Sequence, residues 1–590
     1  MRLTPPTSIV DIVSAHAAAQ PDALAYGFLA SGEIPVQRLT WSEIDLRSRA
    51  IATAIGACTE PGARVLLLFP PGLEFIPAFF GCLRAGAIAL PAYPPTADDR
   101  TASRVRGMVS DAGASLILCP ASVNMKREAI ETLIPEARRL RWLTIEEAEA
   151  HTARAARRRP QPSDVALLQY TSGSTSSPRG VMITHANLLH NLACAARTGQ
   201  YDRDSIGVSW LPVIHDMGLI GGLLQPAFGG FPVWLMAPAS FLQRPVRWLE
   251  AISRFRATHS AGPNFAYALC ARRVTDDDRR TLDLSSWRVA YNGSEPVRLE
   301  TMETFQRAFG ECGFRWDAFA PAYGLAESTL FVCGTPASRD PVTADVDRTS
   351  VSRSLITRPA SERETQSLVS SGQVDNDAQI VIVDPAHRTR CAEHQIGEIW
   401  LSSKSVAAGY WNRPDDTTAT FHAFIDGTHE GPFLRTGDLG FLRGGHLFVT
   451  GRIKDVLIVR GAKHYPQDLE ITVERASTSI RPGSIAAFTI PAPEDDDDDA
   501  IAIVAEIDAR VAKRIEGAVV YCQILTRIRH LVADTHHLQI GAIELVPAGT
   551  LPRTTSGKLQ RYRCRDAFLA GSMPLLARWQ APLLKVRRAS

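Results

Sequence analysis

Short apolar runs alternate with helix-like segments between Val65 and Tyr323, and this alternation constrains the fold more than any other feature of the sequence. Strands that are separated by helices are typical of a mainly parallel α/β sheet with helices on both of its faces. A chain of 590 residues can build several hydrophobic cores, so we expect more than one domain. The runs expected to form strands are 65–69, 116–119, 165–170, 208–211, 233–236 and 287–291.

After about residue 373 the pattern becomes rich in strands, and a smaller α+β unit follows. Residues 440–450 are typical of a hairpin with its turn at 444–445. We therefore predict a large domain, 1–452, and a small C-terminal domain, 453–590. The other expected strands are 380–383, 397–402, 485–490, 501–507 and 543–546, and the expected helices of the small domain are 466–477, 512–536 and 558–570.

A polar segment, about 337–373, separates the α/β part from the strand-rich part. It is rich in Ser, Thr and Arg and has no sustained hydrophobic period. Such a segment is typical of a long loop or of disorder. We expect it to lack regular structure.

Composition limits the class of partner. Hydrophobic residues make up 45% and charged residues 21% of the chain, and its net charge of +2 gives no reason to expect nucleic acid or a membrane surface. The ten cysteines stand singly, so we expect reduced thiols and a cytoplasmic protein. No apolar core of a signal peptide follows Arg2. Residues 217–236 are the nearest candidate for a membrane span, but Gln225, two prolines and five glycines interrupt them, so we expect no span.

One segment is rich in glycine and hydroxyl side chains and ends near Arg179. Gly173 and Gly180 allow backbone angles that expose amide N–H groups, and the guanidinium can bind phosphate bidentately. A flexible surface loop has the same composition, and the segment is not a Walker loop because no Gly-Lys-Ser/Thr follows. We expect it to join a strand to a helix, 186–196, that Thr184 caps. The residues expected to bind phosphate are Thr171, Ser172, Gly173, Ser174, Thr175 and Arg179.

The order of this segment resembles the phosphate-binding motif of the adenylate-forming superfamily, which includes acyl-CoA synthetases, luciferases and the adenylation domains of peptide synthetases. That motif usually reads Thr-Ser-Gly-Thr-Thr-Gly-x-Pro-Lys-Gly, and here Ser176 replaces the second Gly and Arg179 the Lys. Arg keeps the charge but changes its geometry. Seven further stretches match the family in order. The resemblance implies a large domain of α/β sheet layers with a β-rich subdomain, hinged to a small C-terminal α+β domain, and it implies ATP and Mg²⁺ as cofactors.

Several of these stretches imply a nucleotide site. Tyr323 resembles the residue whose ring stacks on adenine, Glu327 resembles the hard oxygen ligand of Mg²⁺, and Asp438 resembles the acceptor of the ribose hydroxyls. Taken singly, a Tyr and a Glu at this spacing are more often a core-edge pair, and the other stretches fit plain turns. The resemblance assigns nucleotide contacts to Asn292, Gly293, Ser294, Tyr323, Gly324, Asp438 and Arg452, and it assigns the domain hinge to Lys454, next to Ile453.

Two stretches imply the reacting groups. His215 resembles the residue that flanks the substrate carboxylate, and the apolar, glycine-rich run after it leaves room for an alkyl chain. Lys558 resembles the lysine of a C-terminal loop that stabilises charge as pyrophosphate leaves. A lone His beside an Asp is usually a structural pair, most lysines are solvated, and a carboxylate at Asp216 would also suit a substrate amino group. The substrate residues implied are His215, Asp216, Met217 and Gly218, with His215 and Lys558 in catalysis.

Three features resemble the fatty acyl-AMP ligase branch: the form of the serine-rich loop, the order His-Asp-Met-Gly at 215–218, and the segment 465–470 after the hinge. The polar segment 337–373 also lies where that branch carries an insertion. This resemblance implies adenylation of a fatty acid and transfer to the phosphopantetheine thiol of an acyl carrier protein of a polyketide or nonribosomal peptide synthase. The alternatives are a long-chain acyl-CoA synthetase, an amino-acid-activating domain and, because of Arg179, a catalytically weak nucleotide-binding partner.

Overall fold

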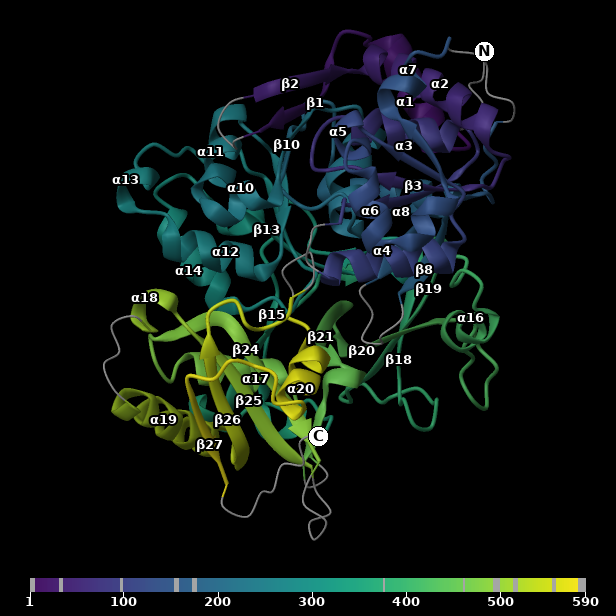
Figure 1. Ribbon diagram of the computed structural model, residues 1–590. Coiled ribbons are helices and arrows are strands. Elements are labelled where there is room, and N and C mark those ends of the chain that lie inside the picture. Colours follow the sequence, from purple (N-terminus) through teal and green to yellow (C-terminus); the bar gives the residue numbers. More distant parts are fainter. Residues whose placement is uncertain are drawn as a thin grey trace.

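A six-stranded sheet lies in the N-terminal part of the molecule (Figure 1). The computed structural model describes residues 6–30, 35–95, 99–152, 159–171, 178–374, 377–459, 462–491, 499–512, 518–553 and 559–581, and all counts below refer to these. The strands are β3 (Arg64–Leu68), β4 (Ile88–Ala92), β5 (Leu116–Cys119), β6 (Arg141–Thr144), β7 (Val165–Thr171) and β8 (Arg179–Thr184). Their order is β6-β5-β3-β4-β7-β8, and they run parallel except for β8.

Helices pack against this sheet and against one another, because their apolar faces need cover. The contact between α2 and α3 is extensive, and every residue of α3 is buried. The helices of this region are α1 (Ile9–Ala19), α2 (Trp41–Cys58), α3 (Phe75–Arg84), α4 (Asp99–Ala112), α5 (Ala121–Asn124), α6 (Arg127–Leu133), α7 (Ile145–Glu149) and α8 (His185–Gly199).

The second sheet has 13 strands among the described residues and combines a parallel part with an antiparallel part. Its order is β18-β19-β20-β21-β17-β14-β13-β12-β11-β9-β10-β1-β2. The six neighbouring strands β13, β12, β11, β9, β10 and β1 run parallel to one another. The strands from β18 to β14 at the other end pair antiparallel. The strands are β1 (Leu24–Leu29), β2 (Pro35–Thr40), β9 (Gly207–Ser209), β10 (Val233–Met236), β11 (His259–Gly262), β12 (Val289–Asn292), β13 (Phe319–Gly324), β14 (Phe331–Gly334), β17 (Gln373–Val374), β18 (Ala378–Val383), β19 (Gly397–Ser403), β20 (Leu434–Arg443) and β21 (His446–Arg452).

The strand-rich region that the sequence predicted is therefore the antiparallel end of this sheet rather than a separate layer. A π-helix (Met217–Leu224) and an aromatic cluster around Trp248 and Trp287 cover the parallel end. The helices here are α9 (Gln225–Gly229), α10 (Pro238–Gln243), α11 (Val246–Phe255), α12 (Asn264–Arg273), α13 (Asp276–Arg279) and α14 (Leu299–Phe309), whereas α16 (Pro414–Phe421) contacts β20 in the antiparallel end.

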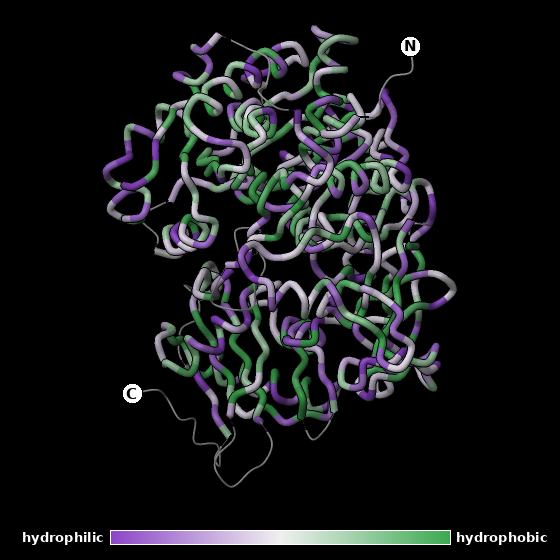
Figure 2. The backbone as a smooth tube through the Cα atoms, turned by 90° about the vertical axis from the view of Figure 1, so that its right-hand side faces the viewer, coloured by the Kyte–Doolittle hydropathy of each residue, from purple (hydrophilic) through white to green (hydrophobic). Residues whose placement is uncertain are grey.

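The C-terminal unit has apolar clusters of its own, around Leu469, Ile503 and Ile528 and around Phe488 and Phe568. In Figure 1 it is the yellow-green part below the N-terminal part, and in Figure 2 hydrophobic stretches run through its middle. Its elements are β22 (Leu457–Val459), β23 (Ala462–His464), α17 (Pro466–Glu474), β24 (Ile480–Ile490), β25 (Ala500–Ile507), α18 (Ala509–Ala512), α19 (Ala518–His536), β26 (Ile540–Pro547), α20 (Arg561–Leu569) and β27 (Ala577–Gln580). The α/β class with a smaller C-terminal unit is confirmed.

One local expectation is wrong. The serine-rich segment does not join a strand directly to a helix, because β8 pairs antiparallel with β7 before α8 begins. Gly180 to Ile183 is short and rich in β-branched residues, which favours a strand. Thr184 does cap α8: its hydroxyl accepts from the Asn187 N–H in a capping box.

The polar insertion is also more regular than its composition predicted. β15 (Thr343–Asp347) and β16 (Thr365–Val369) form an antiparallel pair, and α15 (Arg348–Ser352) follows β15. Ala344 and Val346 alternate with exposed residues and pack in one cluster with Phe441 and Tyr465. The expectation of a loop or disorder is wrong because two apolar side chains per strand suffice when neighbouring elements provide the core.

All ten cysteines are free thiols, and seven of them are buried. No helix among the described residues is long and apolar enough to cross a membrane.

Candidate functional site

A cavity of about 2170 Å³ lies between the N-terminal part and the C-terminal unit. The carboxyl ends of the parallel strands β11, β12 and β13 open onto it, which is where ligands bind in open α/β sheets. Most of the residues that the sequence singled out line this cavity, although they come from distant parts of the chain. Those that line it are Arg179, His215, Asp216, Met217, Gly293, Ser294, Tyr323, Gly324, Glu327, Asp438, Arg452 and Lys454.

The segment after β12 crosses close to β13, and this closeness explains its small residues. A Cβ on Gly293 would lie 2.6 Å from the Ala322 carbonyl oxygen, so a larger residue does not fit. Ser294 has a φ of 72°, a strained value for a residue with a side chain. Asn292 is fully buried, its amide has no hydrogen-bond partner, and it does not line the cavity. Of these three expected residues, only Gly293 and Ser294 line the cavity.

Asp438 is held by two side chains that the sequence assigned to the same ligand. The Tyr323 hydroxyl donates to one carboxylate oxygen at 2.7 Å, and the Arg452 Nε donates to the other at 2.8 Å. The Asp438 carboxylate raises the pKa of Arg452, and burial raises the pKa of Tyr323, so both groups remain protonated donors at neutral pH. The three side chains thus form a rigid polar wall of the cavity.

Glu398, a residue that the sequence did not single out, fixes the turn before Asp438. It is 2% exposed and lies on β19, where its carboxylate accepts from Arg435 at 2.9 Å and from the Gly437 N–H at 3.2 Å. A buried carboxylate must be paired to be tolerated. The signal was present in the sequence: a single Glu stands in the apolar run 397–402.

Glu327 is the carboxylate best placed to hold a cation. The buried Tyr410 hydroxyl donates to it at 2.9 Å, and burial raises the pKa of Glu327. The Arg179 guanidinium lies 5.3 Å from the centre of the Tyr410 ring and 3.6 Å from the carboxylate of Asp416. A desolvated carboxylate bonded to a phenol fits a divalent cation, because a hard oxygen ligand gains most where water is excluded. Sequence reasoning missed Tyr410.

The ends of the phosphate segment lie side by side. Thr171 pairs with Arg179 across β7 and β8. Next to them, Arg104 donates to the Tyr170 carbonyl at 3.3 Å. The expected phosphate ligands Ser172, Gly173, Ser174 and Thr175 lie outside the described residues.

The expected acyl residues lead into the π-helix. Asp216 caps it by accepting from the Met217 N–H at 2.7 Å, and a Cβ on Gly218 would lie 2.1 Å from the Pro212 oxygen. Gln169 on β7 donates to the Ile214 carbonyl at 3.0 Å and so ties this loop to the phosphate strand. Gly218 itself does not line the cavity, but Ile220, Gly221 and Gly222 on the following turn do. π-helical turns are frequent at functional sites, and this one brings an apolar wall to the cavity.

The C-terminal unit contributes the remaining side of the cavity. Lys454 lies in a short 3₁₀ turn (Ile453–Asp455), and Asp455 in that turn accepts from Arg561 at 3.2 Å. Lys558 lies outside the described residues, but Arg553 and Leu559, on either side of its segment, bridge to each other and line the cavity.

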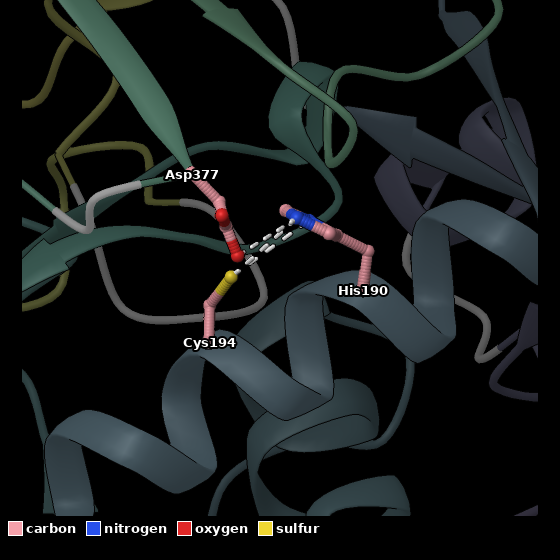
Figure 3. Close-up of side chains that lie close together, drawn as sticks. All are labelled: His190, Cys194 and Asp377. Carbon is pink, nitrogen blue, oxygen red and sulfur yellow. Dashed lines mark hydrogen bonds and ion pairs between the residues drawn. The ribbon is translucent and has the colours of Figure 1, made fainter.

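A second group of ligand-type side chains lies on α8, away from this cavity wall. The side chains of His190, Cys194 and Asp377 point toward one another (Figure 3), and their possible ligand atoms lie within 4.8 Å of one another. However, an Arg197 nitrogen lies 3.3 Å from the Cys194 sulfur and 3.0 Å from the Asp377 carboxylate. The guanidinium therefore supplies the positive charge of this cluster. The cluster ties α8 to the strand β18, and Glu327 is the better candidate for a metal ligand.

The chain matches two protein-family models. Residues 13–411 match the AMP-binding enzyme family, and residues 454–578 match the AMP domain of Disco-interacting protein 2-like proteins. Together they cover most of the N-terminal part and most of the C-terminal unit, and residues 412–453 lie between the two matches.

Similar proteins share almost the whole length. The chain is 42% identical to the medium-chain fatty acid acyl-carrier-protein ligase JamA of Moorena producens, over 98% of this chain and 97% of that protein. It is 36% identical to the long-chain fatty acid AMP ligase FadD32 of Mycolicibacterium smegmatis, over 96% and 95%. A crystal structure of a fatty acyl-adenylate ligase from L. pneumophila, in complex with acyl adenylate and pyrophosphate, superposes with a TM-score of 0.73 at 38% identity, covering 98% of both chains. The chain thus belongs to the AMP-binding enzyme family, and within it to the fatty acyl-AMP ligases.

Proposed function

We propose that this protein activates a fatty acid with ATP, releases pyrophosphate and passes the acyl group to an acyl carrier protein. The observation that carries the proposal is the meeting, in one cavity, of the Tyr323, Asp438 and Arg452 wall, the Glu327 carboxylate, and His215 at the start of an apolar π-helix. The names of JamA and FadD32 describe ligases that act on fatty acids, and this supports the same substrate class here.

The residues divide the work by chemical type. The Tyr323 ring offers a flat face to adenine, and Asp438 accepts hydrogen bonds from the ribose hydroxyls. Arg179 and the backbone of the serine-rich segment bind the β- and γ-phosphates, and the Glu327 carboxylate would hold Mg²⁺, which would supply positive charge to neutralise that of the phosphates. His215 orients the fatty carboxylate. The carboxylate oxygen attacks the α-phosphorus as the bond to pyrophosphate breaks, and the Lys558 ammonium stabilises the charge that develops there.

Contacts between the polar insertion and the C-terminal unit support a carrier protein, rather than CoA, as the acceptor of the acyl group. Gln366 on β16 donates to both oxygens of Asp468 on α17 at 3.2 Å, and Lys463 donates to the Ser354 hydroxyl at 3.0 Å. These contacts bind the insertion to the C-terminal unit and restrain its rotation. This restraint disfavours the arrangement that a free CoA thiol would need and favours the phosphopantetheine arm of a carrier protein, which arrives with its own docking surface.

The test measures pyrophosphate release with a series of fatty acids and with amino acids, and then thioester formation with holo acyl carrier protein or with CoA. We expect release with fatty acids and acyl transfer to the carrier. Efficient formation of acyl-CoA would instead identify an acyl-CoA synthetase. Release with amino acids alone would identify an amino-acid-activating enzyme, and nucleotide binding without any release would identify a weakly catalytic partner.

Substitution of Lys558 by Ala tests the catalytic assignment. Loss of the ammonium should lower acyl-AMP formation by about a hundredfold or more, since a positioned cation at a developing anion contributes on this scale. The thermal midpoint and the Kd for ATP should stay close to those of the wild type. An unchanged rate of pyrophosphate release would refute the role of Lys558.

A further inference from the structure

The cavity continues past the expected carboxylate site toward the opposite edge of the sheet. Gly207, Val233 and His259, at the amino ends of β9, β10 and β11, line it, as do Tyr201 and Phe231. At about 3.3 Å per residue, these strand starts lie roughly 10 Å from the strand ends that face the nucleotide residues. The far end of an acyl chain that enters along the π-helix would lie among them.

Gln225 stands out in this distal part of the cavity. It follows the π-helix directly, at the end away from Met217, and lines the cavity. It is 1% exposed, and neither its amide nitrogen nor its amide oxygen has a hydrogen-bond partner. A buried amide that lacks both partners is costly to keep, so its presence at a ligand cavity needs a reason.

His259 and Tyr201, two other polar side chains at this end, contact neighbouring polar groups. His259 contacts the Thr258 hydroxyl at 2.8 Å and the Gly199 carbonyl at 2.8 Å, and the phenols of Tyr201 and Tyr291 interact with each other. Tyr201 also stacks on His259, with ring centres 4.1 Å apart. The distal end is therefore aromatic and polar, unlike the apolar wall of the π-helix, and the Gln225 amide offers it both an unused donor and an unused acceptor.

We infer that Gln225 selects an acyl substrate that carries a hydroxyl group at or near its distal end. A hydroxyl is one small group that donates and accepts at once, so it satisfies both atoms of the amide together. A plain alkyl end would leave both atoms unpaired, and a site built to hydrogen-bond a substrate hydroxyl discriminates strongly against the analogue that lacks it. This inference rests on the proposed function, because it concerns the acid that is adenylated.

The test compares kcat/KM for pyrophosphate release with octanoate, decanoate, dodecanoate, tetradecanoate and hexadecanoate and with the ω-hydroxy form of each. In the wild type, at one chain length at least, the hydroxylated acid should exceed the plain acid by about tenfold. Gln225→Met and Gln225→Leu keep the volume but remove both polar atoms, so each should invert this ratio. Gln20→Met is the matched control: Gln20 donates to the Gly230 carbonyl at 3.1 Å, at the end of α9, and does not line the cavity. In Gln20→Met, the ratio of kcat/KM for the hydroxylated acid to that for the plain acid should equal the ratio of the wild type.

The outcomes separate the inference from the proposed function. If plain acids are preferred at every length, or if both Gln225 variants keep the wild-type ratio, the inference is overturned and Gln225 contacts only water. A purely structural role would lower kcat/KM for both forms equally and would also overturn it. If no fatty acid of either form releases pyrophosphate, the proposed function itself fails.

Discussion

Glu327 illustrates at the residue scale how a site is maintained at a cost in stability. Burial raises the pKa of Glu327, and the bond from the Tyr410 hydroxyl opposes this shift. The folded protein therefore binds a proton at Glu327 more tightly than the unfolded chain does, so stability falls as pH rises from the ordinary Glu value through the raised one. Ionisation of Glu327 in the folded protein is therefore a net cost in stability, which a bound cation would offset.

Replacing Glu327 by Gln should separate stability from activity. The amide keeps the shape and the bond from Tyr410 but carries no charge, so the thermal midpoint without nucleotide should rise at about pH 8. The difference in thermal midpoint between the variant and the wild type should shrink as pH falls toward the ordinary pKa of Glu, at about pH 4. Pyrophosphate release should drop by about a hundredfold or more, because the substitution removes the charge of the proposed Mg²⁺ ligand. A variant that is less stable than the wild type at neutral pH would contradict this account.

Arg179 allows a second test at this scale. Its guanidinium packs on the Tyr410 ring and lies near Asp416, which fixes its orientation. Arg179→Lys keeps the charge but loses the stacking and the bidentate geometry, so KM for ATP should rise by about three- to tenfold with a smaller change in kcat. Arg179→Met, of similar length and without charge, should be clearly worse. Equal activity of the Lys variant and the wild type would mean that only the charge matters.

At the scale of elements, strands were predicted well from the sequence where the run of residues is apolar. They were missed where neighbouring strands, rather than the residues of the strand itself, stabilise the element. The runs 116–119 and 233–236 match β5 and β10 residue for residue. The strand β11, His-Ser-Ala-Gly, was missed because it has no large apolar residue and is held by parallel neighbours on both sides. The pair β15 and β16 was missed because each strand is only five residues long and has only two apolar residues, which alternate with exposed polar ones in β15 and are adjacent in β16.

The contact between β16 and α17 yields a prediction at this scale. Burial raises the pKa of Asp468, and the Gln366 amide opposes this shift by donating to both carboxylate oxygens. Gln366→Leu leaves that carboxylate poorly solvated, so the contact should weaken by about 1–3 kcal/mol, and amide hydrogen exchange in α17 should accelerate. Gln379→Leu is the matched control, since Gln379 donates to the exposed Glu430 at 3.0 Å. Gln379→Leu should not change amide hydrogen exchange in α17. Equal effects of the two variants would contradict the proposed role of the contact between Gln366 and Asp468.

At the scale of the whole molecule, the candidate site exists only because distant segments converge. Tyr410 bonds Glu327, and Glu398 bonds Arg435, yet neither pair follows any local spacing in the sequence. Resemblance to a family motif could point to Glu327 and Asp438, but the residues that orient them come from strands and loops elsewhere in the chain. Motifs thus indicate the groups that bind ligand, whereas the residues that orient those groups can be identified only in the three-dimensional structure.

The separate apolar clusters lead to a prediction about the two proposed domains. The large clusters of the N-terminal part include no residue after Val449, and those around Leu469 and Phe488 include none before Leu457. A chain that ends at Arg452 should therefore fold and bind ATP, since it retains Tyr323, Asp438 and Arg452. Its thermal midpoint should fall because it exposes the mixed cluster that Tyr465 covers.

The same shortened chain lacks Lys558, so its rate of acyl-AMP formation should fall at least as far as that of full-length Lys558→Ala, by about a hundredfold or more. Calorimetric titration with ATP and a pyrophosphate release assay measure the two properties on one sample. Retained binding with lost turnover would place the decisive cation in the C-terminal unit. If turnover survives in the shortened chain, the adenylation chemistry belongs to the N-terminal part alone, and the C-terminal unit serves only the transfer of the acyl group.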